Sequence, residues 1–161
     1  MGQKEGDMVE EGKSAPDFDL PTDAGKPLKL SKLKGHPVVV YFYPKDDTSG
    51  CTKEAQDFSC LAGQFEAAKV KIIGISPDTV ESHAKFRRKY DLSVHLAADT
   101  DKAVATAYGV WVEKSMYGRK YMGVERATFL IDGKGCVAKI WRKVKVPGHA
   151  EAVLAAAKDL T

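Results

Sequence analysis

The sequence predicts a single α/β domain in which a mixed central sheet is flanked by helices and preceded by a short N-terminal hairpin. Three observations support this prediction. The chain has 161 residues, a length typical of one domain. Hydrophobic residues make up 43% of it, which is enough for a core that needs no disulfide or metal crosslink. Strand-like apolar runs alternate with helix-like periodicity along most of the chain, a pattern typical of parallel strands joined by helices.

The N-terminal part predicts an arm, a hairpin and the first central strand. Residues 1–14 are polar and of mixed charge, so we expect a flexible arm there and one domain over residues 15–161. Residues 18–30 alternate apolar and polar side chains around turn-forming residues, which predicts a short edge hairpin. Residues 38–43 are a continuous β-branched and aromatic run that ends at Pro44, and they predict a buried central strand.

Helices and strands alternate after this strand. Over residues 51–69 apolar side chains recur every three or four positions, which predicts one helix. Residues 71–75 predict a second buried strand, and residues 80–90 a charged helix capped by Asp78 or Thr79. A shorter strand at residues 94–97 and a helix at residues 101–108 continue the alternation, which favours parallel βαβ units.

The C-terminal part has a different pattern. Residues 128–131 and 137–144 flank the turn sequence Asp-Gly-Lys-Gly, which predicts an antiparallel hairpin, and residues 151–160 predict a closing helix. Parallel strands first and antiparallel strands last are the order of a thioredoxin-like fold. Between the two halves, residues 111–123 are expected to form the longest loop, and we expect Trp111 and Tyr117 to pack near the functional site.

Charge and hydropathy exclude several classes of partner. The chain has 25 Lys and Arg against 22 Asp and Glu, a net charge of +3, so it lacks the strong field that captures nucleic acid or an anionic membrane. Basic and apolar residues alternate over residues 139–145, which fits a half-exposed strand better than a nucleic-acid surface. The first 36 residues contain no apolar run of signal-peptide length, and no transmembrane segment follows. We therefore expect a soluble cytoplasmic protein.

The cysteines and histidines argue against crosslinks and metals. The three cysteines, Cys51, Cys60 and Cys136, form no C-x-x-C pair and are odd in number, which indicates free thiols in a reducing compartment. The histidines show no H-x-x-x-H spacing, so a metal site is not expected. We expect each of them to be a surface or capping residue; they are His36, His83, His95 and His149.

The segment over residues 44–51 is the most informative part of the chain, because it lies between a buried strand and the start of a helix. In a first helical turn, unpaired backbone N–H groups and the positive end of the helix dipole favour the thiolate form of Cys51. Open α/β sheets also bind ligands beyond the carboxyl ends of their strands. Thr48 could direct its hydroxyl at the sulfur or at a bound oxygen, although on its own it would be only a helix cap.

The same segment resembles a known family. Pro44, Thr48 and Cys51 match the P-x-x-x-[TS]-x-x-C signature of the peroxiredoxins, and YFYPKDDTSGCTKEA is similar to the bacterioferritin comigratory protein, or peroxiredoxin Q, subfamily. Similar stretches follow at SPDTVESHAKF, GVWVEKSMYGRKYMGVERATFLID and VAKIWRKVKVPGHAEAVL, so the resemblance covers about residues 15–161. It implies a thioredoxin-like fold and an antioxidant peroxidase that reduces hydrogen peroxide or organic hydroperoxides without metal, haem or flavin.

The resemblance also implies roles for individual residues. Cys51 would be the peroxidatic thiol, Thr48 its hydrogen-bonding partner, Pro44 a shield, and Arg126 the catalytic arginine. Arg126 precedes the strand predicted at residues 128–131, and a guanidinium there would stabilise a thiolate and polarise the peroxide O–O bond.

Glu54 has two interpretations. It lies three residues after Cys51 on the same helix face, so it could hold Arg126 in place through a bidentate ion pair. Alternatively, it is a solvated carboxylate in the first helical turn.

The positions that carry a resolving cysteine in the subfamily are not cysteine here. They correspond to Gln56 and Arg87. Once peroxide has oxidised Cys51 to a sulfenic acid, an external thiol is then required, which predicts a one-cysteine mechanism. The expected reductant is thioredoxin, glutaredoxin or a small-molecule thiol, and the expected assembly is a monomer or weak homodimer.

The two other thiols are weaker candidates. Cys60 lies nine residues beyond Cys51, which on one helix places it on the opposite face and about 13 Å along the axis. A disulfide needs Cα atoms within about 7 Å. Cys60 is therefore either a resolving thiol that requires the helix to unwind or a packed apolar thiol, and Cys136 is expected to be structural.

Two other functions use the same nucleophile. A thioredoxin-like disulfide reductase requires the second cysteine of a C-x-x-C pair, which is absent. A non-enzymatic redox sensor or holdase would use Cys51 to control a partner interface. Repeated turnover of peroxide distinguishes a peroxidase from such a sensor.

Overall fold

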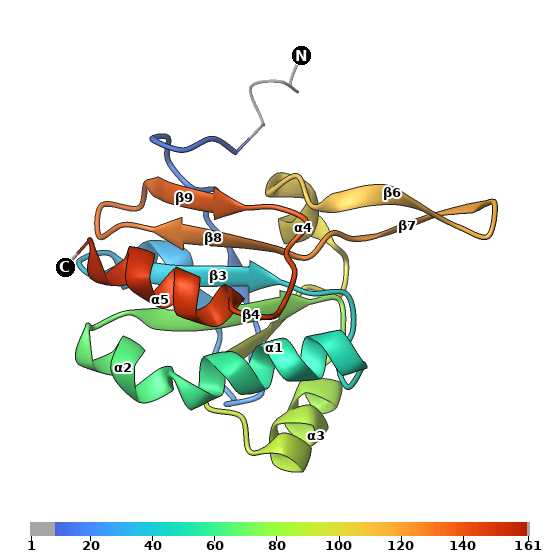
Figure 1. Ribbon diagram of the computed structural model, residues 1–161, viewed down its shortest axis with the longest axis horizontal. Helices are drawn as coiled ribbons and strands as arrows, with labels where there is room; N and C mark the ends of the chain where they lie inside the picture. Colours follow the sequence, from blue (N-terminus) through green and yellow to red (C-terminus); the bar gives the residue numbers. More distant parts are fainter. Residues whose placement is uncertain (1–8, 161) are drawn as a thin grey trace.

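The computed structural model describes residues 9–160 and contains a five-stranded mixed sheet at its centre. The strands of this sheet are β3 (Val38–Phe42), β4 (Lys71–Ser76), β5 (His95–Ala98), β8 (Ala127–Ile131) and β9 (Val137–Trp141). They lie in the order β5-β4-β3-β8-β9, as Figure 1 shows. β3, β4 and β5 are parallel, whereas β8 pairs antiparallel with both β3 and β9. The predicted thioredoxin-like α/β fold is confirmed.

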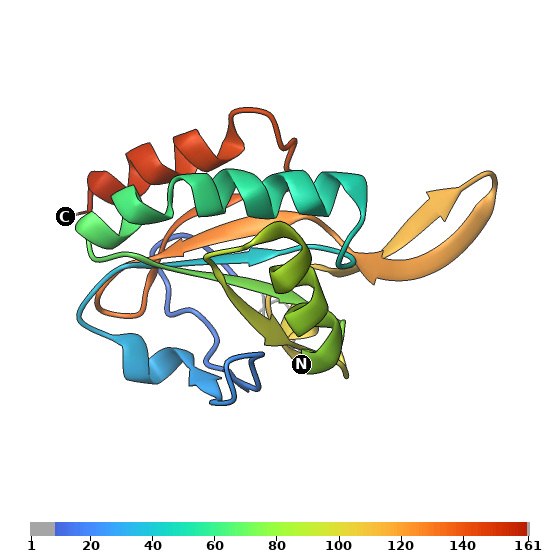
Figure 2. The ribbon, with the colours of Figure 1, turned by 90° about the horizontal axis from the view of Figure 1, so that it is seen from below.

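Helices cover both faces of the sheet. One face is covered by α1 (Ser49–Cys60), α2 (Ala62–Ala67) and α5 (His149–Lys158), which lie side by side in Figure 2. α3 (Val80–Tyr90) adds Phe86 to the same hydrophobic cluster, and the side chain of Thr79 caps it by accepting from the backbone N–H of Ser82. α4 (Ala103–Ala107) packs on the opposite face.

β3 is buried on both faces because its side chains alternate between two clusters. Every residue from Val38 to Tyr43 is at most 2% exposed. The odd-numbered residues of this segment face α1 and α5, and the even-numbered residues face α4 and the N-terminal hairpin. A strand that packs on both faces needs a continuous apolar run, which is the pattern that predicted it.

Gly74 leaves the space that the ring of Tyr41 fills. The two residues are paired in the register of β3 and β4, and a Cβ atom on Gly74 would lie 2.7 Å from the Tyr41 ring. The ring stacks on Phe58 of α1 with 4.8 Å between centroids. The glycine thus allows a large side chain to support the helix that carries Cys51.

The single helix predicted over residues 51–69 is two helices in the structure. The break is at Leu61, whose backbone N–H bonds to the carbonyls of Asp57 and Phe58, so the last turn of α1 tightens before α2 begins. Phe58 and Phe65 lie in one cluster on the same side of the sheet, which explains why apolar periodicity did not reveal the break. The helix predicted at residues 101–108 is shorter than expected, and the helix predicted at residues 151–160 begins two residues earlier.

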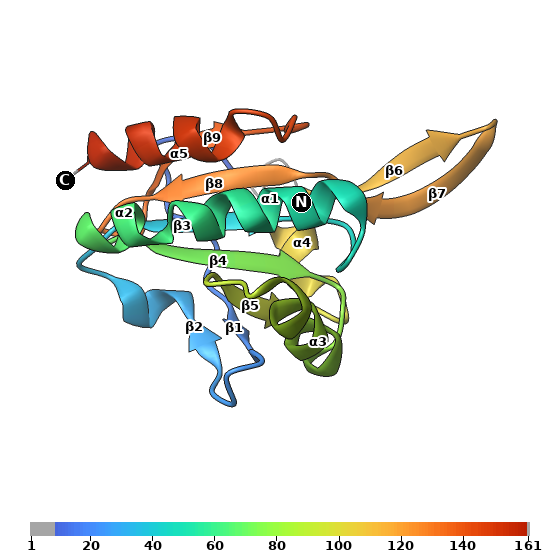
Figure 3. The same ribbon diagram turned by 60° about the horizontal axis from the view of Figure 1, so that its bottom comes forward.

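The prediction of a loop over residues 111–123 is wrong. This segment is an antiparallel hairpin of β6 (Trp111–Met116) and β7 (Arg119–Val124), which projects away from the central sheet in Figure 3. Tyr117 and Gly118 form its turn with φ values of 54° and 78°, as a two-residue hairpin turn requires. Tyr117 is 95% exposed and does not pack near the site, whereas Trp111 is partly buried at the base.

The N-terminal hairpin is present as β1 (Asp19–Leu20) and β2 (Leu28–Lys29), and the 3-10 helix η2 (Leu30–Leu33) follows it. Of the arm predicted over residues 1–14, residues 1–8 lie outside the described part. Residues 9–14 lie against β9, where Gly12 N–H donates to the Val137 carbonyl and Val137 N–H donates to the Lys13 carbonyl. Within residues 9–160, no helix is long and apolar enough to cross a membrane.

Candidate active site

The strand register brings Arg126 to the start of α1. Phe42, the last residue of β3, pairs with Ala127, the first residue of β8. Arg126 immediately precedes Ala127, so it lies beside the point where the chain leaves β3 and turns towards α1. Cys51 is the third residue of α1, in its first turn. Two segments 75 residues apart in the chain therefore meet at one edge of the sheet.

The guanidinium of Arg126 bridges two buried acidic groups. Its Nη2 donates to Cys51 Sγ at 3.3 Å, and its Nη1 donates to Glu54 Oε1 at 2.6 Å. Cys51 and Glu54 are each only 1% exposed. The Arg126–Glu54 ion pair that the sequence allowed is present, but it is not bidentate, because the other arm of the arginine contacts the sulfur. A cationic donor at this distance favours the thiolate.

Glu54 is a buried carboxyl group, so the alternative of a solvated carboxylate is wrong. Burial raises the pKa of Glu54 from 4.5 to about 7, although the charge and hydrogen bond of Arg126 act in the opposite direction. Its Oε2 has no hydrogen-bond partner among the described residues. For Arg126, burial lowers the pKa, but attraction to Glu54 and Cys51 outweighs burial and raises it, so the guanidinium stays charged.

Thr48 and Pro44 lie in the loop that precedes α1. Thr48 is the N-cap residue of α1, with extended backbone angles of φ −99° and ψ 158°. Its hydroxyl donates to the carbonyl of Lys45 at 2.9 Å and is not directed at the sulfur. Its side chain is exposed, whereas Pro44 is half-buried. Both residues are close to Cys51 in the chain, but the hydroxyl of Thr48 would have to turn to reach a bound oxygen.

The two other thiols lie away from this cluster. Cys60 is the last residue of α1 and is exposed, so the interpretation of Cys60 as a packed apolar thiol is wrong. Cys136 is half-buried and forms an isolated β-bridge with Ser14. It lies beyond Ile131, which is at the end of β8 opposite to Arg126. All three cysteines are free thiols.

Two histidines that were expected at the surface are buried. His149 Nε2 lies 2.8 Å from Thr128 Oγ1, and its ring packs edge-on against Phe58 and Trp141. Burial, with a smaller effect of Arg126, lowers the pKa of His149 to about 4, so the ring is neutral at neutral pH. His83 is 0% exposed. Its spacing of three residues from Phe86 on the inner face of α3 is the signal that could have predicted its burial.

Lys114 is a second cation near the site that the sequence did not reveal. It lies on β6, and its side chain crosses Gly123, where a Cβ atom would be 3.2 Å from Lys114 Cδ. Partial burial and the nearby Arg126 lower the pKa of Lys114, while Cys51 opposes this shift. The hairpin, which was predicted as a loop, thus brings positive charge towards the sulfur of Cys51.

Comparison with known proteins identifies the family. The sequence model of the AhpC/TSA family matches residues 12–140. Peroxiredoxin Bcp of Bacillus subtilis is 46% identical over 153 residues, which are 95% of this chain and 98% of that protein. The putative peroxiredoxin Bcp of Coxiella burnetii is 50% identical over 146 residues, which are 91% of this chain and 97% of that protein.

Solved structures support the same assignment. A cysteine-to-serine mutant of peroxiredoxin Q from Xanthomonas campestris matches with a TM-score of 0.86 and 46% identity, covering 89% of this chain and 92% of that chain. The bacterioferritin comigratory protein of the same organism matches with a TM-score of 0.87 and 44% identity, covering 93% and 98% of the two chains. The chain therefore belongs to the AhpC/TSA family, in its Bcp or peroxiredoxin Q subfamily, and is a thiol peroxidase.

Proposed function

We propose that Cys51 is the peroxidatic cysteine of this thiol peroxidase and that the chain follows a one-cysteine cycle. The observation that carries the proposal is the position of Arg126, which bonds to Cys51 and Glu54 at once. A helix N-terminus and a guanidinium both favour the anionic sulfur, which is the nucleophile. The Xanthomonas campestris relative was described for alkyl peroxide reduction, which supports organic hydroperoxides as substrates beside hydrogen peroxide.

The proposed reaction begins with attack of the Cys51 thiolate on the terminal oxygen of the hydroperoxide. An S–O bond forms as the O–O bond breaks, and the sulfur gives up two electrons. The departing oxygen takes up a proton and leaves as water or an alcohol, while Cys51 becomes a sulfenic acid. Arg126 stabilises the charge that moves onto the departing oxygen. Thr48 would turn its hydroxyl from Lys45 towards the peroxide, and Pro44 would shield the sulfur from water.

An external thiol completes the proposed cycle. Gln56 and Arg87 occupy the two positions where relatives of the subfamily are expected to carry a second cysteine. Cys60 is at the far end of α1, about 13 Å from Cys51 along the helix axis. Two external thiols, or a thioredoxin or glutaredoxin with two thiols of its own, would convert the sulfenic acid to a thiol, release water and themselves be oxidised to a disulfide. We expect a monomer or weak homodimer acting in a reducing cytoplasm.

Peroxide consumption by the wild type and by Cys51→Ser tests the assignment of the nucleophile. With dithiothreitol and then thioredoxin as electron donor, the wild type should remove many equivalents of hydrogen peroxide, and Cys51→Ser should remove none above background. Activity retained in Cys51→Ser would refute the proposal. Consumption that stops after one equivalent with every donor would favour the redox-sensor alternative.

Peptide mass spectrometry tests the one-cysteine cycle. After one equivalent of peroxide without reductant, Cys51 should carry a sulfenic acid, and excess peroxide should give the sulfinic form. Cys60→Ser and Cys136→Ser should each keep most of the turnover with a small-molecule thiol. A dominant Cys51–Cys60 disulfide that is lost in Cys60→Ser would contradict this cycle and show that α1 unwinds.

A further inference from the structure

Two residues link the β6–β7 hairpin to the central sheet, and the second of them is Arg126. β7 ends at Val124 and β8 begins at Ala127, so Glu125 and Arg126 belong to neither strand. The paired residues of β8 therefore do not include Arg126. Contacts from outside the sheet must fix the backbone of this arginine.

The connection between β9 and α5, residues 142–148, supplies such contacts. It passes the start of β8 in Figure 1, and its Val144 N–H donates to the backbone carbonyl of Arg126 at 3.0 Å. The N–H of Lys143 donates to Glu125 Oε2 at 3.3 Å. Both donors are backbone groups, so no side chain of the connection takes part in these bonds. The main-chain path of the connection thus fixes the point from which the Arg126 side chain starts.

Lys143 has an uncommon backbone conformation. Its φ is 48°, in the left-handed region that residues with a side chain rarely occupy. Such angles are common after helices and in hairpin turns, but Lys143 follows a strand. A departure of this kind beside a functional site indicates a positional requirement. Here the left-handed residue immediately precedes Val144, whose N–H reaches Arg126.

Lys69 has the same conformation without this contact. Its φ is 61°, and the N–H of the following residue, Val70, donates to the carbonyl of Phe65 at 2.9 Å, which closes the end of α2. Lys69 and Lys143 are both exposed. Lys69 lies at the end of the sheet where the parallel strands begin, and Arg126 lies at the end where β3 stops.

His149, the first residue of α5, makes a further contact with this region. Its Nε2 lies 2.8 Å from Oγ1 of Thr128, which follows Arg126 by two positions and so points to the same face of the sheet. The His149 ring also packs edge-on against Phe58 of α1, with 6.1 Å between centroids. The ring thus contacts both the strand that follows Arg126 and the helix that carries Cys51.

The guanidinium of Arg126 has little space in which to absorb a displacement of its backbone. A Cβ atom on Gly50 would lie 3.1 Å from Arg126 Nη2, so this nitrogen lies directly against the first turn of α1. Nη1 is held by Glu54 Oε1 at 2.6 Å. A shift of the Arg126 backbone therefore changes the 3.3 Å contact with Cys51 or weakens the pair with Glu54.

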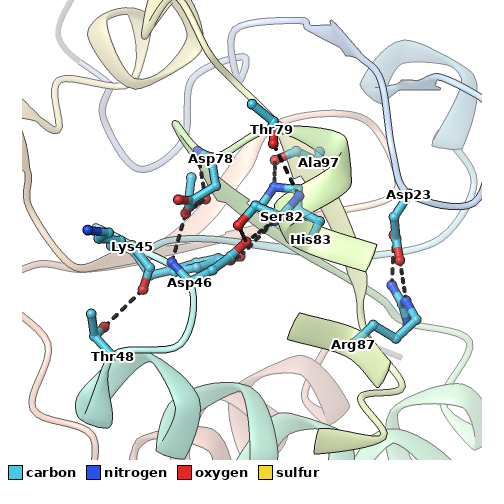
Figure 4. A network of polar contacts seen from close by, with 12 residues as sticks. Asp23, Lys45, Asp46, Thr48, Asp78, Thr79, Ser82, His83, Arg87 and Ala97 are labelled. Atoms are coloured by element: carbon cyan, nitrogen blue, oxygen red, sulfur yellow. Dashed lines mark hydrogen bonds and ion pairs between the residues drawn. The ribbon is translucent and has the colours of Figure 1, made fainter. Parts of the chain in front are cut away.

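Other residues hold the α1 side of the contact. Thr48, the N-cap residue, donates to the carbonyl of Lys45, and Asp46 of the same loop accepts from Ser82 of α3, as Figure 4 shows. These bonds do not involve the connection between β9 and α5. The arginine side and the cysteine side of the site can therefore be disturbed separately.

We propose that the connection between β9 and α5 positions Arg126 against Cys51, and that Lys143 and His149 are its positioning residues. Lys143 acts through its left-handed backbone, and His149 acts through its contact with Thr128. This inference rests on the proposed roles of Cys51 and Arg126 in peroxide reduction. It predicts that changes at Lys143 or His149 slow the reaction although neither side chain touches the peroxide.

Lys143→Val and Lys143→Gly separate the backbone of Lys143 from its charge. Both remove the ammonium group, but valine disfavours a positive φ, whereas glycine accepts it. Competition with horseradish peroxidase for hydrogen peroxide measures the rate constant of Cys51 oxidation. Lys143→Val should lower this rate constant about tenfold, because small displacements in an active site have effects of this size. Lys143→Gly should leave it nearly unchanged, and equal rate constants in the two variants would overturn the proposal.

Lys69→Val is the matched control. It makes the same substitution in the same left-handed conformation before a valine, so it should lower the melting temperature about as much as Lys143→Val. Its rate constant for peroxide should stay at the wild-type value, because Lys69 has no bond to Arg126 or Glu125. A comparable slowing in Lys69→Val would show a general effect of lost stability and would overturn the role of Lys143.

His149→Gln and His149→Leu test the second contact. A glutamine side chain can form a hydrogen bond with Thr128 Oγ1, whereas leucine fills part of the same space without one. His149→Leu should slow Cys51 oxidation several-fold, and His149→Gln should keep most of the wild-type rate. Equal rates in these two variants would leave His149 only a packing role and would overturn its positioning role.

Two measurements report on the geometry without catalysis. In a Cys60→Ser, Cys136→Ser background, the ultraviolet absorbance of the Cys51 thiolate should appear at higher pH in Lys143→Val than in Lys143→Gly, since a displaced guanidinium favours the anion less. The amide of Val144 should exchange with solvent faster in Lys143→Val than in the wild type. Identical titrations and identical exchange would contradict the proposal.

The outcomes separate this inference from the proposed function. If Arg126→Met does not slow the reaction, the proposed role of the arginine fails, and this inference fails with it. If Arg126→Met slows the reaction and Lys143→Val does not, this inference alone fails. If Lys143→Val does not fold, Lys143→Ala, which disfavours a positive φ less strongly, takes its place in each comparison.

Discussion

The active-site loop, residues 43–48 between β3 and α1, and the β6–β7 hairpin both approach the sulfur of Cys51, but they are held in opposite ways. The loop is held to α3 and to the residues just before it by hydrogen bonds that Asp46 makes with Asp78, Ser82 and His83. In the described structure, β6 and β7 pair only with each other. Among residues 9–160, the hairpin also carries four of the five exposed large hydrophobic side chains, Met116, Tyr117, Tyr121 and Met122. The comparison indicates that the loop fixes the geometry of the site through its bonds to the rest of the domain, whereas the hairpin contributes the charge of one side chain, Lys114.

Loss of Arg126 should have the largest effect, because it removes the contact between the sulfur and the rest of the site. Arg126→Met should lower the rate constant for peroxide by about 10²–10³-fold, the typical effect of removing a charge-stabilising donor. Competition with horseradish peroxidase measures this rate. Arg142→Met is the control, since Arg142 lies over the Phe129 ring at 5.8 Å and should leave the rate nearly unchanged. Equal rates in wild type and Arg126→Met would show that the arginine has only a structural role.

Glu54 of α1 should make the free energy of unfolding depend on pH. Its pKa is raised from 4.5 in an ordinary environment to about 7, so the folded protein binds a proton that the unfolded chain releases. The stability that this proton contributes is complete below pH 4.5 and is lost as the pH rises through 7. Relative to Glu54→Gln, the wild type should lose up to about 3 kcal/mol of unfolding free energy over this range. Urea titrations at several pH values measure the difference, and a constant difference would contradict the raised pKa.

Lys114 should link the hairpin to the chemistry with a smaller effect. Lys114→Met keeps the length of the stem that crosses Gly123 and removes the charge that lies near Cys51. The loss of roughly 1 kcal/mol of attraction between partly solvated charges predicts peroxide reduction about fivefold slower. Lys120→Met is the control, because Lys120 is exposed near the tip and pairs with Ser115. Similar rates for both variants would exclude a role for Lys114 in the reaction.

The tip of the hairpin should be the least sensitive part. Tyr117 lies in the left-handed region with a φ of 54°, where asparagine is better accepted. Tyr117→Asn should change stability by at most about 0.5 kcal/mol and leave the peroxidase rate unchanged. A denaturant midpoint and a steady-state assay check both. A clear loss of activity would show that the tip contacts a substrate or reductant, which would reverse the comparison.

The sequence predicted the central strand and the position of Cys51, the proposed nucleophile, because both depend on local pattern. Residues 38–43 are apolar without interruption, and a strand buried on both faces has no other pattern available. Cys51 follows a turn-forming segment at the start of an amphipathic helix, so its place in the first helical turn was predictable. The β6–β7 hairpin could not be predicted in this way, because its strands are largely exposed and therefore lack a buried apolar face.

The polar contacts could not be predicted because their partners are distant in the chain. The Arg126–Glu54 pair spans 72 residues, and the Asp46–His83 pair spans 37. No local period encodes such pairs. Resemblance to the peroxiredoxins is the basis of the role proposed for Arg126, but it did not indicate the contact that divides the guanidinium between Cys51 and Glu54. Asp46 is one of two consecutive aspartates in a polar loop, and its burial depends on the fold.

The space at Gly74 couples the sequences of two neighbouring strands. The glycine has no unusual φ, so the requirement comes entirely from the Tyr41 ring that lies against it. A large aromatic residue at position 41 and a residue without a side chain at position 74 should therefore vary together among relatives. A chain with a smaller residue at position 41 could accept alanine or valine at position 74, whereas either change alone would leave a cavity or push the ring towards α1. Gly74 has no part in the proposed reaction. It nevertheless limits which residues can occupy position 41, whose side chain lies in the same hydrophobic cluster as Cys51.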